Sequence, residues 1–276
     1  CSSNTTKQGA HHLHHGVVIK GSMEAGARAD FFVDVDRRES IKRNHSATHL
    51  LDAALRKVLG EHVNQKGSLV EPGRLRFDFS HPQAMTADEI KSIEQLVNHH
   101  VLANEPVVTE IMSMDEAKAK GAIALFGEKY EDTVRVLSMG ALVDDAHFSI
   151  ELCGGTHVGA TGDIGLFKIT TETGVAAGIR RIEAITGKAA VQFVEDIQTK
   201  EAQVASVLKT EPYRLLERAE QIMAELKEKD ATIAAANQKL AMYRANELLE
   251  QVETVKGTKV VAQFVEVLRL LIYGLW

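Results

Sequence analysis

The chain has 276 residues, of which 45% are hydrophobic and 25% are charged, and its formal net charge is −6. This composition is typical of a globular protein with two or three domains, and it excludes a protein that binds nucleic acid over a largely basic surface. Any nucleic-acid contact must therefore be a local patch. The last apolar stretch, residues 265–276, contains Glu266 and Arg269 and is too short to cross a bilayer. We expect a cytoplasmic protein without a structural disulfide, since its cysteines are only Cys1 and Cys153.

The first forty residues predict short strands. Residues 15–22 form an apolar run that ends in a turn, and residues 30–36 alternate apolar with acidic side chains. We interpret residues 1–38 as part of a small β-barrel, and we expect the chain, which begins with Cys1, to be a piece of a longer protein. A helix should follow, with Ser40 as its N-cap and Gly60 at its end.

Residues 39–187 predict an α+β domain with two layers of mixed strands and helices. A hairpin is expected from residues 63–69 and 74–79, because Glu71-Pro-Gly73 between them is a strong turn signal. Thr86 is a suitable N-cap for a helix that continues to residue 103. The remaining elements expected here are strands at 107–112, 134–139, 164–171 and 179–185, and a short helix at 115–120.

The pattern becomes helical after residue 187. We expect a helix over residues 188–209 and a second one that begins at Pro212, since proline suits the first turn. Apolar residues then recur at seven-residue spacing on two neighbouring rows. One row has Leu208, Leu215, Ile222, Ala236 and Tyr243 and is interrupted by Lys229, and the other has Ala219, Leu226, Ile233 and Leu240. This arm, residues 188–256, is either an amphipathic helix lying on its own domain or a coiled coil or helical hairpin. Residues 257–276 should begin a further domain, with a strand at 259–265.

Two short motifs carry candidate chemistry. In His45-Ser-Ala-Thr-His49 the spacing places both imidazoles on one face of a helix. In Cys153-Gly-Gly-Thr-His157 the two glycines permit a tight loop in which a thiolate and an imidazole converge. Together they would provide three nitrogens and one sulfur, a set suited to Zn²⁺, although each motif alone also fits ordinary core residues. A zinc protease is disfavoured, because Ser46 stands where that class has its glutamate base.

These motifs, with Gln65-Lys-Gly-Ser68, Arg74-Leu-Arg-Phe-Asp-Phe-Ser80 and Gly178-Ile-Arg-Arg-Ile-Glu183, resemble the editing domain of the alanyl-tRNA synthetases. The resemblance runs from about residue 10 to residue 255. Threonyl-tRNA synthetases and free-standing editing proteins are related but fit less well. The resemblance implies hydrolysis of tRNA(Ala) mischarged with serine or glycine, and one zinc ion held by His45, His49, Cys153 and His157. ATP and Mg²⁺ would belong to an aminoacylation core before residue 1, and a homodimer could form through the arm.

The resemblance also implies an amino-acid pocket around Gln65, Thr48 and the loop residues Gly154, Gly155 and Thr156. Gln65 could instead face solvent, and Thr48 could serve only in helix packing. Glu151 is either a general base or a solvated strand carboxylate. The zinc could orient the α-amino group of the substrate, which we favour, activate water, or be structural. A non-catalytic tRNA-binding and dimerisation module is the main alternative to an editing enzyme.

Basic and histidine-rich segments are candidates for tRNA or metal contacts. Arg180 and Arg181 are neighbours on a strand and should face opposite ways, with Arg180 free to clamp a phosphate and Arg181 in a surface ion pair. Lys42 and Arg43, at the start of the first helix together with Arg37 and Arg38, could meet the tRNA backbone or be merely solvated. The His11-His-Leu-His-His15 tract is interpreted as surface, outside the main site.

Overall fold

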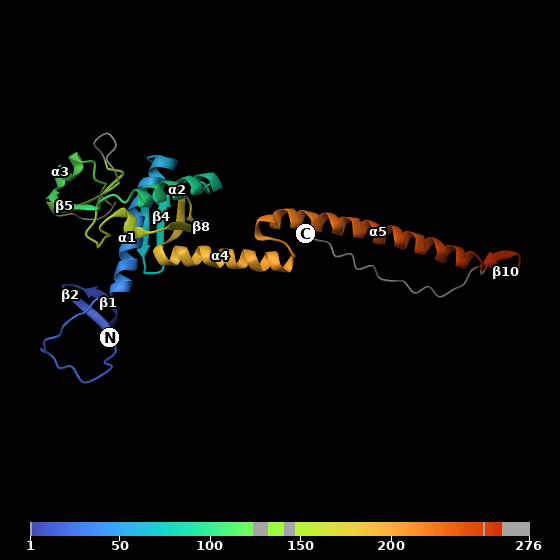
Figure 1. The fold of residues 1–276 in the computed structure, drawn as a ribbon, viewed down its shortest axis with the longest axis horizontal. Helices are drawn as coiled ribbons and strands as arrows, with labels where there is room; N and C mark the ends of the chain where they lie inside the picture. The colour runs from blue at the N-terminus through green and yellow to red at the C-terminus, as the bar shows by residue number, and fades with distance from the viewer. Residues whose placement is uncertain (1, 124–131, 141–146, 251, 261–276) are drawn as a thin grey trace. The chain divides into compact units, whose positions relative to one another are not determined.

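The computed structural model describes residues 2–123, 132–140, 147–250 and 252–260 (Figure 1). The chain divides into two units, residues 1–193 and 194–276. The architecture is α+β, as predicted, with antiparallel sheets and no closed barrel among the described residues. Within the same residues, no helix is both long and apolar enough to span a membrane.

The first unit begins with an antiparallel hairpin of β1 (Ser2–Gln8) and β2 (His11–Gly16). Its place in a barrel stays a prediction. The strand expected at residues 30–36 is wrong, and so is Ser40 as the N-cap, because helix α1 spans Val35–Leu59 and is capped by Asp34. The Asp34 side chain accepts a hydrogen bond from the Arg37 backbone N–H at 3.0 Å. An aspartate that satisfies a free N–H at a helix start outweighs a short alternating pattern.

A four-stranded antiparallel sheet forms the centre of this unit, in the order β3-β4-β9-β8. The strands are β3 (Gln65–Val70), β4 (Leu75–Ser80), β8 (Phe167–Ala176) and β9 (Ile179–Thr186). The predicted β3–β4 hairpin is confirmed. Alternation along β4 directs Phe77 and Phe79 into the core, where neither side chain is exposed.

Helices α1 and α2 (Ala87–Ala103) pack beside this sheet, as Figure 1 shows near β4 and β8. The N-cap Thr86 is confirmed, and it forms a capping box with Glu89. The shared core is made of apolar side chains from both layers: Leu50, Leu51, Leu55, Phe77, Phe79, Ile93, Val97, Phe167 and Ile182. Complete burial of a Leu or Phe stabilises the fold by about 1.5–3 kcal/mol per side chain, so this core fixes α1 rigidly on the sheet.

A second, three-stranded sheet has the order β5-β6-β7, with β5 (Val108–Ser113), β6 (Thr133–Met139) and β7 (Ser149–Leu152). The short helix α3 (Met114–Ala119) connects to β5, and a 3₁₀ turn η1 covers Thr161–Ile164. The bounds of strand β7 were not predicted, because four residues are too few to show a period. It contacts α1 and places the Cys153 loop beside that helix.

The remaining elements are α4 (Gly187–Val207), the 3₁₀ turn η2 (Pro212–Arg214), α5 (Leu215–Glu250) and a hairpin of β10 (Glu253–Val255) and β11 (Thr258–Val260). Both predicted helices are present, and the strand expected at 259–265 lies partly outside the described residues. On α5 the seam residues Leu226, Ile233 and Leu240 are 50%, 57% and 47% exposed. A coiled-coil partner for them stays a prediction.

Candidate metal centre

The two motifs meet between α1 and the loop that follows β7. The ligand atoms of His45, His49, Cys153 and His157 all lie within 4.8 Å of one another. Cys153 Sγ is 3.5 Å from His45 Nε2 and 3.3 Å from His157 Nε2. His49 is buried, whereas the other three side chains are partly accessible, so the cluster opens to solvent on their side.

The other ring nitrogen of each histidine is held by an oxygen acceptor. His49 Nδ1 lies 2.5 Å from the Glu151 carboxylate, His157 Nδ1 lies 3.1 Å from Ser46 Oγ, and His45 Nδ1 lies 3.3 Å from the Thr156 carbonyl oxygen. An oxygen acceptor at Nδ1 favours the tautomer in which Nδ1 carries the proton and Nε2 keeps its lone pair. Metal-binding histidines are oriented in this way by their outer partners.

A zinc ion fits this arrangement of donors. His49 Nε2 is buried and has no hydrogen-bond partner, which is costly unless something else satisfies it. The three Nε2 atoms and one thiol form a nitrogen and sulfur set that suits tetrahedral zinc. Among the described residues, a search for three or more His, Cys, Asp or Glu side chains that could share a metal ion identifies this group of four.

Electrostatics in the metal-free protein favour a thiolate here. Burial alone would raise the pKa of the Cys153 thiol, but the surrounding His157, His45 and His49 lower it from 9.0 to about 3. Burial would likewise lower the pKa of His49, but the Glu151 carboxylate and the Cys153 sulfur raise it to about 10. The pKa of His157 is lowered by burial and by its imidazole neighbours. Protonated His49 is therefore a cation beside the Cys153 thiolate, and Zn²⁺ that binds His49 would replace its proton.

Close packing in the loop depends on a glycine. A Cβ atom on Gly155 would lie 2.2 Å from Cε1 and 2.8 Å from Nδ1 of His45, whereas a Cβ on Gly154 would meet nothing within 4 Å. The backbone at residue 155 is thus part of the wall that holds the His45 ring, and only glycine leaves room for it.

Several residues that complete this centre were missed or misjudged from sequence. Ser46 was noted only for not being glutamate, yet its Oγ contacts His157 and accepts the Val158 backbone N–H at 3.2 Å. Glu151 is not a solvated carboxylate, since it is only 3% exposed and both of its oxygens are hydrogen-bonded, one to His49 and one to Ser149. Asn44 ties the start of the motif to the β3–β4 turn through the Glu71 carbonyl. The one available signal was their closeness in sequence to the histidines and the cysteine.

Known proteins are similar to this chain over most of its length. A family model described as "Threonyl and Alanyl tRNA synthetase second additional domain" matches residues 134–183. A protein of Saccharophagus degradans named alanine–tRNA ligase is 51% identical over 94% of this chain. Proteins of the same name from Chromohalobacter salexigens and Hydrogenovibrio crunogenus are 50% and 49% identical over 96% and 95% of the chain. Over nearly its whole length, the chain is therefore similar to one segment of the alanine–tRNA ligases. It spans 29% to 30% of the length of these relatives.

The pocket residues that the family resemblance implies lie on α1, on β3 and in the loop that follows β7. The Thr48 hydroxyl donates to the Asn44 carbonyl oxygen at 2.8 Å and is buried, an arrangement that suits helix packing. Gln65 pairs with Phe79 across the sheet, so its half-buried side chain shares the face that carries the core. Thr156 contributes its carbonyl oxygen to His45. Contact of any of them with an amino acid stays a prediction.

The two arginines of the family's Gly-x-Arg-Arg motif face opposite sides of the sheet, as expected. Arg181 forms a bidentate pair with Asp78, at 2.7 and 2.8 Å. Arg180 is paired as well, at 2.5 and 2.7 Å with Glu172, so a phosphate would have to compete with that carboxylate. Lys42 contacts Glu39, and Arg43 donates to the Asp163 carbonyl oxygen. Their contact with tRNA stays a prediction.

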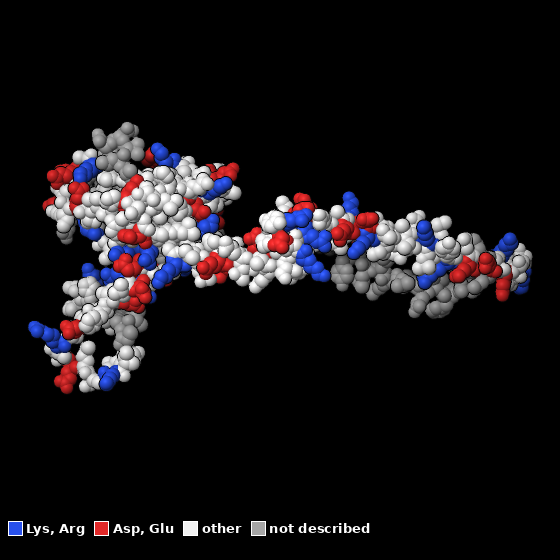
Figure 2. Space-filling model, in the orientation of Figure 1, with Lys and Arg blue, Asp and Glu red and all other residues white. Residues whose placement is uncertain are grey.

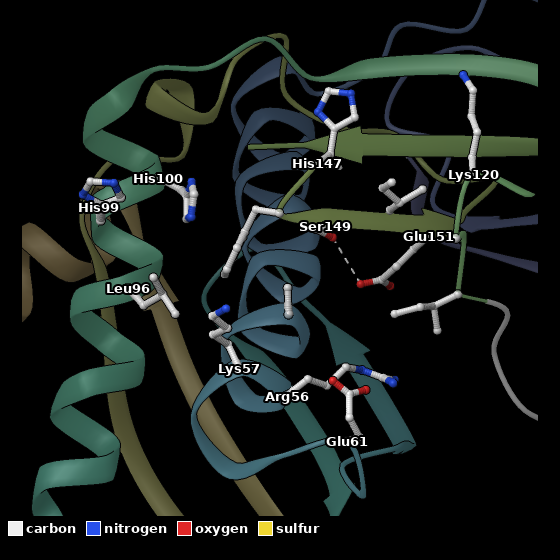
Figure 3. A pocket seen from close by; sticks show the side chains of 15 residues that line it. Arg56, Lys57, Glu61, Leu96, His99, His100, Lys120, His147, Ser149 and Glu151 are labelled. Carbon is white, nitrogen blue, oxygen red and sulfur yellow. Dashed lines mark hydrogen bonds between the residues drawn. The ribbon is translucent and has the colours of Figure 1, made fainter. Parts of the chain in front are cut away.

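A pocket of about 680 Å³ has Glu151 in its lining (Figure 3), and the same carboxylate contacts His49 of the cluster. Arg56 and Lys57 of α1, His99 of α2 and Lys120 also line the pocket. Behind this lining, burial and the nearby Glu151 charge raise the pKa of Asp52 to about 6, while Arg56 opposes that shift. Glu151 therefore stands between the metal centre and a pocket with basic side chains at its edge.

Charge elsewhere is mixed. On the face drawn in Figure 2, basic and acidic side chains are intermingled and separated by uncharged surface, so this face has no general basic character. The histidine tract on β2 is exposed, as predicted, and the His14 ring lies beside Phe31 in a tilted arrangement, with ring centroids 4.9 Å apart.

Proposed function

We propose that the chain is a zinc-assisted editing module that hydrolyses the ester of Ser-tRNA(Ala) and Gly-tRNA(Ala). The observation that carries this proposal is the set of three imidazole Nε2 atoms and one thiol within 4.8 Å, in a chain related to alanine–tRNA ligases. A pocket for alanine cannot strongly reject glycine or serine, since one small group is worth only about 1–3 kcal/mol. A second, hydrolytic site is the chemical remedy for such errors.

In the proposed reaction, water adds to the ester carbonyl, and the bond to the terminal ribose oxygen breaks. The products are the free amino acid and a tRNA with its hydroxyl restored. Zinc would supply a Lewis acid that holds the α-amino group of the substrate. We favour this orienting role over activation of water, and either role would need a fifth position on zinc or the loss of one ligand, because four protein donors alone complete a tetrahedral set.

The chain's own residues would preorganise this site. Glu151, Ser46 and the Thr156 carbonyl fix the three rings, so that the donors need not rearrange when substrate arrives. A carboxylate that is 3% exposed and bound to His49 suits orientation of that ring better than removal of a proton from water. The partly accessible side, formed by His45, Cys153 and His157, is where we place the aminoacyl ester.

Deacylation of preformed aminoacyl-tRNA tests the proposal. The zinc-loaded chain should release serine from Ser-tRNA(Ala) faster than a Cys153→Ala variant, and it should spare Ala-tRNA(Ala). A His99→Ala variant, which removes an exposed imidazole outside the cluster, should keep the full rate. Serine release no faster than that of Cys153→Ala would refute an editing activity. Neither ATP nor Mg²⁺ is needed in this assay.

A second function is a non-catalytic tRNA-binding and dimerisation module with structural zinc. The closed set of four donors and the exposed seam on α5 favour it. In that case the chain would bind tRNA(Ala) and self-associate, while the ester stayed intact. Measuring tRNA binding and the oligomeric state alongside deacylation separates the two functions.

A further inference from the structure

Arg135 lies at the metal-binding loop but belongs to a different strand. It sits on β6, and its Nη1 donates to the carbonyl oxygens of Cys153 at 3.0 Å and Gly155 at 2.5 Å. In addition, the Cys153 backbone N–H donates to the Arg135 carbonyl oxygen at 3.0 Å. One residue thus contacts the first and third positions of the Cys153-Gly-Gly-Thr-His157 loop.

The loop at residues 153–157 needs a contact that orders its backbone more than most loops do. Two successive glycines cost more conformational entropy to order than any other pair of residues. Pairing of β6 with β7 ends at Val136 and Leu152, and the Cys153 N–H adds one more bond, so the backbone ladder does not extend to Gly155. The Arg135 guanidinium holds the backbone beyond the last strand-pairing hydrogen bond, because its rigid donors can bind two carbonyl oxygens at once.

Gly155 borders three of the four candidate ligands. Its backbone forms the wall against the His45 ring, and Cys153 and His157 stand on either side of it in the loop. We propose that Arg135 is a positioning residue of the metal centre, which holds the loop so that Cys153 and His157 meet His45 and His49. The inference rests on the zinc site of the proposed function but not on its hydrolytic step.

Zinc affinity, measured by competition with a chromophoric chelator, tests this inference. An Arg135→Met variant should bind zinc about 10–100-fold more weakly, the usual cost of losing an outer partner of a metal ligand. Arg135→Lys keeps the charge and can donate to one carbonyl, so it should lose less. Arg74→Met is the matched control: its guanidinium contacts Glu71 and Glu183, away from the loop, and its affinity should equal that of the unmodified chain.

Cobalt provides a readout that a merely stabilising role would not change. The visible spectrum of bound Co²⁺ reports thiolate ligation and tetrahedral geometry, and it should change in Arg135→Met but not in Arg74→Met. If Arg135→Met fails to fold, Arg135→Lys decides in its place. Unchanged affinity and an unchanged cobalt spectrum in the folded Arg135 variants would overturn the inference.

The outcomes separate this inference from the proposed function. If the unmodified chain binds zinc but leaves Ser-tRNA(Ala) intact, the editing proposal fails, and the role of Arg135 is decided by the affinities alone. If the unmodified chain binds no zinc, both proposals fail. If it binds zinc and edits while Arg135→Met binds zinc equally well, only the inference about Arg135 fails.

Discussion

Replacing Gly155 with alanine should disconnect His45 from the metal centre. The added Cβ would lie 2.2 Å from His45 Cε1. Ordinary carbon–carbon contacts are about 3.5–4.0 Å, so the ring would have to move by more than about 1 Å. Zinc–nitrogen bonds tolerate only about 0.2 Å of error, so the ring cannot absorb this shift and remain a ligand.

The expected loss is large. Disturbing a partner outside the ligand set costs about 10–100-fold in metal affinity, so losing a ligand should cost at least the upper end of that range. A hundredfold weaker zinc affinity corresponds to about 2.8 kcal/mol. The neighbouring Gly154→Ala is the control, because its Cβ would meet nothing within 4 Å.

The measurement is again chelator competition, with the melting temperature of each metal-free variant to confirm folding. Because the clash requires the imidazole, the Gly155→Ala change should cost far less in a chain that already carries His45→Ala. Equal zinc affinities for Gly155→Ala and Gly154→Ala would refute the steric argument, and with it the placement of His45 against the loop.

Two further predictions concern protons. Because the pKa of His49 is raised to about 10 and that of Cys153 is lowered to about 3, zinc should displace a proton from the imidazole and none from the thiol near neutral pH. Zinc affinity should then fall about tenfold for each unit by which the pH is lowered between about 9 and 7. Calorimetry in buffers of different ionisation enthalpy should show that one proton is released for each zinc ion bound. A zinc affinity that does not change with pH over this range would contradict the prediction. Hydrogen bonds from Thr86 lower the pKa of Glu89 in the folded chain. The ionised Glu89 carboxylate therefore stabilises the fold at pH values above its pKa in the unfolded chain, and this stabilisation is lost as the pH falls through its pKa in the folded chain. Glu89→Ala should accordingly lower the melting temperature at pH 7 more than at pH 3, and an equal drop at both would count against the capping role.

Local patterns predicted the elements that have strong local signals. The β3–β4 hairpin follows from its Pro-Gly turn, and α2 follows from Thr86 and Glu89, because both depend on neighbours in sequence. The start of α1 was misplaced, since alternation over residues 30–36 and the capping potential of Asp34 compete in the same segment. Strand β7 is short and is held by pairing with β6, a contact that a local pattern cannot contain.

By itself, the sequence determined the identity and order of the donors: two imidazoles one helical turn apart, and a thiol and an imidazole on either side of a flexible loop. Only the tertiary structure decided that these donors meet, that Glu151 and Ser46 hold their rings, and that both arginines of the Gly-x-Arg-Arg motif are already paired. The reason is distance along the chain. Residues 45 and 153 are brought together by the packing of α1 against the sheets, and that packing depends on apolar side chains spread over the whole domain.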